Sequence, residues 1–216
     1  MSEKLSGFRM PGEWEPQKSV WIAWPYNKND WPGLYKFIPE VILEIIYKIS
    51  KHQKVNLIIN SKIENIKKIL KLNKIKNISF HRIKTDRIWL RDSGPIFLTN
   101  KKYKKKIILN FVYNGWAKYK NCKNDNKIND KLSKIVKLKK INPTIKKNGK
   151  SRKVIMEGGA FDVNGAGTIL LTEECLLSKI QERNKKFNKK DYEGIFNKYL
   201  NIKNFIWLKK GIIGDD

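Results

Sequence analysis

Thr85-Asp-Arg-Ile-Trp-Leu-Arg-Asp-Ser-Gly-Pro95 stands between two strand-like runs, Ile78–Ile83 and Ile96–Thr99. Before it, strands alternate with helices; after it, strands come in hairpins separated by helices. Such mixing along a whole chain predicts an α/β or α+β fold without a domain linker. The stretch itself concentrates carboxylates, guanidinium groups and an indole ahead of Gly94-Pro95, which favours a loop that carries chemistry. Turn chemistry leaves open a plainer interpretation, in which Asp92-Ser-Gly-Pro95 is only a surface turn.

The residues before this stretch predict a strand-helix-strand-helix-strand order. Short apolar runs predict strands at Val20–Pro25, Val55–Ile59 and Ile78–Ile83. Apolar residues recurring every three or four positions predict a helix over Leu34–His52 and a second helix that Ser61 caps.

The residues after this stretch predict two further groups of elements. Ile96–Thr99 and Lys105–Tyr113 form a predicted hairpin, and Asp125–Leu138 a predicted amphipathic helix. Lys139–Lys153 is polar and predicts an exposed excursion, and the Gly pair in Val154–Val163 predicts an interrupted strand with a close backbone approach. The remaining predictions are a strand at Thr168–Leu171, a helix near Tyr192–Leu200 and a strand at Phe205–Leu208.

The composition is strongly basic, since 47 basic and 20 acidic residues among 216 give a net charge of +27. The excess is nearly all lysine scattered through every segment, without the clustered arginines and aromatics of a nucleic-acid surface. We therefore expect no specific nucleic-acid partner, although weak binding to polyanions at low salt fits this charge. Two cysteines without metal-like spacing, no signal-peptide pattern and no membrane-length apolar run predict a cytoplasmic protein without a membrane partner.

Two acidic residues stand in settings that demand a partner. Asp92 stands two residues before Gly94 and Glu157 directly before Gly158, each shortly after an apolar pair, and an unpaired buried carboxylate is costly. One interpretation is a structural ion pair with Arg91 or Arg87. The other is a cationic ligand, for which a guanidinium is best suited because its planar fork of donors matches two carboxylates.

Several blocks of the chain resemble a known family. Trp89-Leu-Arg-Asp-Ser-Gly-Pro95, Met156-Glu-Gly-Gly159 and Thr172-Glu-Glu-Cys-Leu-Leu177 are similar, in order, to blocks of the agmatine deiminase and bacterial peptidylarginine deiminase family. Met10–Pro16 and Asn114–Tyr119 look like further family blocks. The resemblance implies an α/β pentein fold, a propeller of ββαβ units, of which residues 1–216 would form about three of five as a single incomplete domain.

The same resemblance implies a reaction and roles for particular residues. Members hydrolyse a guanidinium to a ureido group and ammonia through a cysteine thiolate, without cofactor or metal; agmatine would give N-carbamoylputrescine, toward putrescine. Asp92 would grip the guanidinium and Glu157 would orient a catalytic histidine. Trp89 and Trp116 would line the arm of the substrate, and Asp86 is a weaker candidate for a polar contact. For these last three residues, ordinary packing is an equally open interpretation.

The chain also departs from the family pattern. It ends at Gly214-Asp-Asp216, where the family continues into a block that supplies the histidine, with the nucleophilic cysteine further on. Neither His52 nor His81 lies in such a block, and Cys122 and Cys175 do not match the nucleophile. We therefore expect no deiminase activity from these residues alone, and expect a homo-oligomer or a separately encoded C-terminal half as partner. A non-catalytic guanidine-binding remnant, a peptidylarginine deiminase and, more distantly, a nucleic-acid binder remain as alternatives.

Overall fold

The computed structural model describes residues 5, 7–60, 63–102, 104–147 and 149–212. Its first sheet has the order β1-β2-β3 with all strands parallel. The elements of this part are β1 (Ser19–Ala23), α1 (Ile38–Ser50), β2 (Lys54–Ile59), α2 (Ile63–Leu72) and β3 (Ile78–Arg82). Helices α1 and α2 make the crossovers that parallel neighbours require. Ser61, predicted as the cap of the second helix, lies outside the described residues.

Two later parts of the chain share one order of elements: a hairpin, a helix and a strand that returns parallel to the hairpin. In the first, β4 pairs antiparallel with β5, and β6 joins β5 in parallel after α4. In the second, β9 pairs antiparallel with β10, and β11 joins β10 in parallel after α6. Their bounds are β4 (Ile96–Asn100), β5 (Lys105–Leu109), α4 (Ile128–Val136), β6 (Lys140–Ile141), β9 (Phe161–Val163), β10 (Thr168–Thr172), α6 (Lys189–Leu200) and β11 (Asn204–Leu208).

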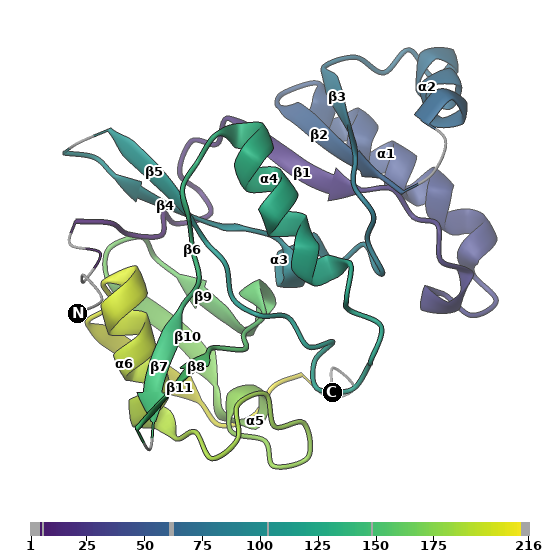
Figure 1. Ribbon diagram of the computed structural model, residues 1–216. Helices are drawn as coiled ribbons and strands as arrows, with labels where there is room; N and C mark the ends of the chain where they lie inside the picture. Colours follow the sequence, from purple (N-terminus) through teal and green to yellow (C-terminus); the bar gives the residue numbers. More distant parts are fainter. Residues whose placement is uncertain (1–4, 6, 61–62, 103, 148, 213–216) are drawn as a thin grey trace.

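These parts form two lobes, and one of the three hydrophobic cores joins them. Figure 1 shows the β1–β3 sheet with α1 and α2 in one lobe, the other sheets in the second, and α4 between them. The largest core gathers β4, β5, β9, β10 and α6, while a second lies under α1 and α2. The third core joins the lobes, since Ile128 and Leu132 of α4 pack on Ile58 of β2. The protein is therefore α/β, as predicted, and no described helix is long and apolar enough to cross a membrane.

The structure differs from the predictions mainly where polar or glycine-rich sequence was involved. Residues 139–153 include β6 and a further hairpin, β7 (Thr144–Lys147) with β8 (Lys150–Lys153); β8 is exposed throughout, as an excursion should be. The predicted interrupted strand keeps only β9, because Gly158–Ala160 forms a 3-10 turn. Likewise, α3 (Leu90–Ser93) adds one helical turn to the 85–95 stretch.

Other boundaries moved by a few residues. The Leu34–His52 helix begins as a 3-10 turn at Tyr35–Phe37, and α1 proper starts beside Pro39, which fits a first helical turn. The helix predicted over Asp125–Leu138 divides similarly into a 3-10 turn, Asp125–Lys127, and α4. A four-residue helix, α5 (Glu173–Leu176), follows β10. None of these shifts changes the order of strands and helices.

Candidate active site

Asp92 lies on the single turn of α3, which ends where Gly94 donates its N–H to the Leu90 carbonyl at 2.8 Å. A β-carbon at position 94 would overlap that carbonyl oxygen, so the sharp exit needs glycine. The half-buried Asp92 carboxylate accepts the Gly159 N–H at 3.1 Å and a hydrogen bond from the Trp116 side chain. The turn therefore presents Asp92 to two segments that are distant in sequence.

The environment of Asp92 disfavours its charge. Burial, and next the negative charge of Glu157, raise its pKa from 3.8 to about 6, although both hydrogen bonds and Arg91 act in the opposite direction. A cation placed against this pair would offset both unfavourable effects. The site is thus electrostatically suited to a positively charged group.

Glu157 is the more deeply buried member of the pair, with 2% of its surface exposed. Its Oε1 accepts a hydrogen bond from Nε of the buried Arg183 at 3.3 Å, while its Oε2 has no hydrogen-bond partner. Buried polar atoms usually have a partner. Half of this carboxylate is therefore left for a donor other than the described residues.

The glycines after Glu157 allow its segment to lie against α3. A β-carbon on Gly158 would overlap the Arg91 carbonyl oxygen, and one on Gly159 would overlap Asp92 Oδ1. Arg91 holds the same junction from outside, donating from Nε to the Gly158 carbonyl at 3.2 Å and from Nη2 to Asp162 at 3.0 Å. Close backbone approach, expected from the Gly pair, is what brings the two carboxylates together.

Trp116 reaches Asp92 from an unusual turn. Gly115, Trp116 and Ala117 have φ values of +67°, +59° and +57°, and a non-glycine residue held there costs about 1–3 kcal/mol. A β-carbon at Gly115 would overlap the Tyr119 carbonyl oxygen. The turn keeps its strained conformation and delivers an indole N–H to the carboxylate, an arrangement that often accompanies function.

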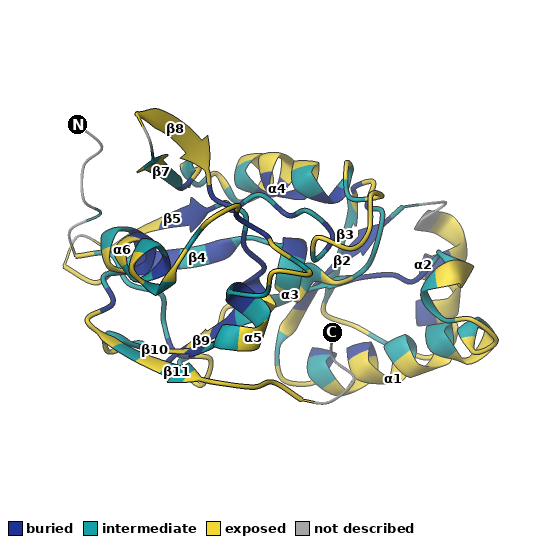
Figure 2. Cartoon of the chain, turned by 90° about the horizontal axis from the view of Figure 1, so that it is seen from below, coloured by how far each residue is buried: buried dark blue, intermediate teal, exposed yellow. Residues whose placement is uncertain are grey.

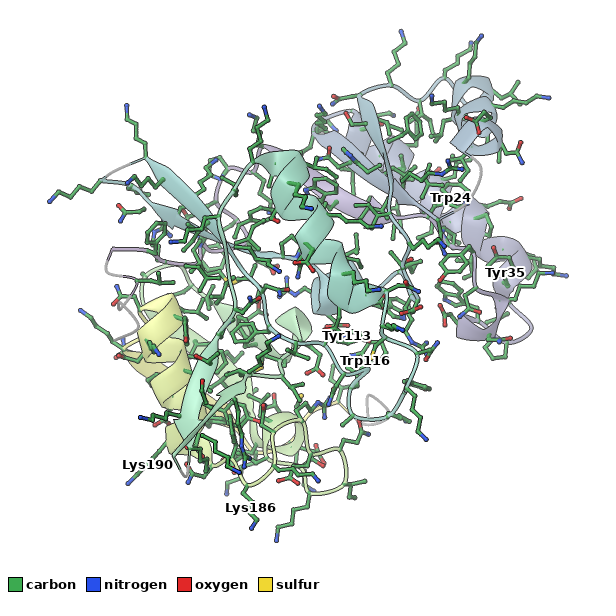
Figure 3. The ribbon with its side chains drawn as sticks, viewed as in Figure 1. Trp24, Tyr35, Tyr113, Trp116, Lys186 and Lys190 are labelled. Atoms are coloured by element: carbon green, nitrogen blue, oxygen red, sulfur yellow. The ribbon has the colours of Figure 1, made fainter. Side chains whose placement is uncertain are left out.

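Tyr113 closes the site from the same loop and was not singled out in the sequence. Its ring lies edge-on to Trp116 with centroids 5.2 Å apart (Figure 3), and its buried hydroxyl has no hydrogen-bond partner among the described residues. Burial, followed by the charge of Asp92, raises the pKa of this hydroxyl. Tyr113 is therefore a neutral donor close to two carboxylates.

Asp86 lies in a second acidic cluster, formed by Asp30, Asp86, Asp125 and Arg87. Asp86 accepts the Asn124 backbone N–H at 2.5 Å and the Asn124 side-chain amide at 2.6 Å. The Asp125 carboxylate in turn accepts the Asp86 backbone N–H at 2.8 Å. Burial raises the pKa of Asp125 to about 6. These crossed contacts bind the 85–87 stretch to the 124–125 stretch, which favours a structural role for Asp86.

Arg87 supplies the cation of this second cluster. Its Nη1 donates to Asp30 at 2.8 Å, with the two side chains 12% and 2% exposed. Its guanidinium lies 4.3 Å from the centre of the Tyr119 ring. The interpretation that Arg91 or Arg87 pairs with Asp92 or Glu157 is not supported, since Arg87 pairs with Asp30 and Arg91 with Glu13 and Asp162. Glu157 has a different arginine, Arg183, as its partner.

Comparison with known sequences adds to this geometry. The sequence model of the family described as Porphyromonas-type peptidyl-arginine deiminase matches residues 9–216. The chain belongs to this family. A provisionally named agmatine deiminase of Marinomonas sp. (strain MWYL1) is 30% identical over 100% of the chain and 56% of its own length. One of Legionella pneumophila (strain Paris) is 32% identical over 99% of the chain and 58% of its own.

Solved structures agree with the sequence relatives. Agmatine deiminase of Enterococcus faecalis superposes with a TM-score of 0.80 at 28% identity, covering 96% of this chain and 55% of the other. The substrate-bound agmatine deiminase of C. jejuni gives 0.80 at 30% identity, covering 97% and 58%. This deiminase-family chain therefore spans somewhat more than half the length of these relatives, and the expected resemblance is confirmed.

In this deiminase-family chain, the structure brings some of the predicted site residues together and places others elsewhere. Asp92, Glu157 and Trp116 converge, whereas Asp86 is held by the second cluster. Trp89, which is 39% exposed, packs against Trp31 with ring centroids 5.7 Å apart, so its part in a substrate site stays a prediction. Arg183 and Tyr113 are additions from the structure. Tyr113 directly precedes the Asn114–Tyr119 block, and no pattern in the sequence pointed to Arg183.

The remaining chemistry-bearing residues lie apart from this arrangement. His81, on β3, bonds Asn56 through Nε2 at 3.0 Å and stacks near Trp21. Burial raises the pKa of the Cys122 thiol, which disfavours a thiolate there. Among the described residues no group of three or more histidine, cysteine or acidic side chains could hold a metal ion.

Proposed function

We propose that this chain forms the guanidinium-gripping part of an agmatine deiminase. The observation that carries the proposal is the convergence of Asp92 and Glu157, with Oε2 of Glu157 unpartnered and Asp92 disfavoured as an anion. A planar cation with several N–H donors satisfies both carboxylates at once. The names of the relatives point to the same substrate class.

The proposed architecture is that of the pentein propeller. The repeated hairpin-helix-strand order of β4–β6 and β9–β11 supports ββαβ units, with the β1–β3 part as the first of about three present from five. Residues 1–216 are then one incomplete domain of a cytoplasmic hydrolase. No cofactor enters the proposed chemistry.

The proposed reaction uses groups from the remainder of a full-length deiminase. A thiolate attacks the guanidinium carbon, ammonia leaves with one of its nitrogens, and a water activated by histidine hydrolyses the thiouronium to a ureido group and restores the thiol. Asp92 and Glu157 hold the cation, and Glu157 also orients the histidine through Oε2. Trp116 and Trp89 line the carbon arm of agmatine, and Asp86 is a weaker candidate for a polar contact in the site.

Titration calorimetry of the 216-residue chain tests whether it binds a guanidinium group. Agmatine should bind, and butylamine, which has the arm but no guanidinium, should bind much more weakly. Asp92→Asn should weaken agmatine binding at least about tenfold, because it removes a desolvated charge pair. Glu44→Gln, which removes an exposed carboxylate on α1, is the matched control. Equal affinities of Asp92→Asn and the control would overturn the proposal.

Product analysis separates the enzyme from a guanidine-binding remnant. We expect no N-carbamoylputrescine from agmatine with the chain alone, and product when the remaining part of a full-length relative is added. Binding of agmatine without product in either mixture would favour the remnant. Deimination of a peptidyl-arginine substrate in preference to agmatine would favour the alternative activity suggested by the family's name.

A further inference from the structure

Tyr113 carries a polar group at the candidate site that the proposed function does not use. The residue is 3% exposed, and its hydroxyl has no hydrogen-bond partner among the described residues. Figure 2 shows buried positions on α3 in the middle of the molecule, whereas strand β8 on the outside is exposed along its length. Because a buried hydroxyl usually has a partner, a ligand of the site is a candidate for that partner.

The position of Tyr113 is fixed by contacts within the chain. Asn126, in the 3-10 turn before α4, accepts the Tyr113 backbone N–H at 3.0 Å and donates its side-chain amide to the Tyr113 carbonyl. The ring lies edge-on to Trp116, whose side chain donates a hydrogen bond to Asp92. After burial, the charge of Asp92 raises the pKa of the hydroxyl most, ahead of that of Asp125. The hydroxyl is therefore held near Asp92 before a ligand binds.

The two carboxylates of the site have too few free acceptor positions for a whole guanidinium. An ionised carboxylate offers about four acceptor positions, and an alkylguanidinium has about five N–H donors. Asp92 already accepts hydrogen bonds from Gly159 and Trp116. Glu157 accepts one from Arg183 and, in the proposed reaction, one from the histidine. About four positions remain for about five donors, so one N–H of the guanidinium needs a third acceptor.

We propose that the Tyr113 hydroxyl accepts this remaining N–H and makes the site specific for a guanidinium group. This contact presupposes the proposed function, since the guanidinium must lie between Asp92 and Glu157. A hydroxyl can donate and accept at once, so Tyr113 can still donate its own hydrogen to a carboxylate. An amidinium has one N–H fewer than an alkylguanidinium and leaves the buried hydroxyl without a partner. The site should therefore favour an alkylguanidine over the amidine of the same length.

A double-mutant cycle that combines Tyr113→Phe with a modified ligand tests this contact. The probes are agmatine and its amidine analogue, in which a methylene group replaces the bridging N–H, and calorimetry measures both affinities for each variant. The preference for agmatine should be at least about tenfold smaller in Tyr113→Phe than in the unchanged chain. The matched control is Tyr47→Phe, which removes the hydroxyl of a tyrosine that is 37% exposed on α1 and should keep the full preference. An equal preference in the two variants would overturn the proposal.

Asp92→Asn separates a failure of this contact from a failure of the proposed function. When the guanidinium lies between the two carboxylates, Asp92→Asn weakens the binding of both ligands. If Asp92→Asn leaves agmatine binding unchanged, the proposed function is wrong, and the Tyr113 contact is wrong with it. If Asp92→Asn weakens binding while Tyr113→Phe keeps the full preference for agmatine, only the Tyr113 contact is wrong.

Thermal unfolding without ligand shows whether the hydroxyl instead stabilises the fold. Tyr113→Phe removes a buried hydroxyl that has no partner among the described residues, so the melting temperature should stay the same or rise. A melting temperature lowered by about 4 °C or more, with both ligands weakened equally, would assign the hydroxyl to the fold and contradict the proposal.

Discussion

The two acidic clusters beside the 85–95 stretch differ in where their hydrogen-bond donors come from. In the cluster of Asp30, Asp86, Asp125 and Arg87, the carboxylates accept backbone N–H groups across two stretches and an arginine of the chain supplies the cation. Around Asp92 and Glu157, the donors are one backbone N–H, one indole and Arg183. Both clusters contain an arginine paired with a buried carboxylate, and both leave carboxylate oxygens without a partner among the described residues. What separates them is the set of backbone N–H groups that Asp86 and Asp125 accept, which ties two stretches together and favours a structural role.

The largest effect is expected from Arg87→Met, which removes the internal cation of the structural cluster. It leaves the buried Asp30 side chain with the Asn27 amide but without a cation, so the free energy of unfolding should fall by about 3 kcal/mol. Urea denaturation followed by far-UV circular dichroism measures this. Lys48→Met, which breaks the exposed pair with Glu44 on α1, should cost well under about 1 kcal/mol. A similar loss of stability in both variants would show that the cluster around Arg87 has no special structural role.

Gly159→Ala should have the next largest effect and should act on the candidate site. The new β-carbon would overlap Asp92 Oδ1, so α3 and the 157–160 turn must separate, at a cost of about 2 kcal/mol. Agmatine binding should weaken as the two carboxylates move apart. Gly194→Ala is the control, since a β-carbon there meets no atom within 4 Å. Unchanged stability and agmatine binding in Gly159→Ala would show that the close approach is not needed.

Asp92→Asn should stabilise the protein at neutral pH while it weakens agmatine binding. The folded-state pKa of Asp92, about 6, lies above its ordinary 3.8, so ionisation costs stability progressively as pH rises from about 4 to about 6. The variant should therefore exceed the unchanged chain by about 1–2 kcal/mol above this range, and the difference should vanish below about pH 4. Denaturation midpoints at several pH values measure this. A variant that is less stable at neutral pH would place Asp92 with the structural carboxylates.

Trp116→Phe should give the smallest effect, seen in the pH dependence of binding. The indole hydrogen bond lowers the pKa of Asp92, so its removal should raise that pKa and shift the onset of agmatine binding to higher pH. Calorimetry across this range should find a shift of about half a pH unit, with affinity nearly restored at high pH. An affinity that is reduced equally at every pH would assign Trp116 to packing or substrate contact alone.

Local sequence patterns determined much of the fold. Val55–Ile59 could be identified as a strand, because a short apolar run, interrupted here only by Asn56, is a property of neighbouring residues. The α1 helix likewise followed from its three-to-four periodicity. The glycine pair after Glu157 indicated a close approach, and the Trp89–Pro95 and Met156–Gly159 blocks indicated the family and the two carboxylates.

Only the tertiary structure decided which partners those residues have. Arg183 reaches Glu157 across 26 residues, and Asp86 reaches Asn124 across 38. No local pattern distinguishes these side chains from other charged ones, because burial and partner depend on how whole segments pack. The same is true of β10 and β11: the sequence predicted both strands, but only packing determined which of their side chains are buried. Local sequence patterns determine the helices and strands, whereas the packing of segments distant in sequence determines which side chains form the site.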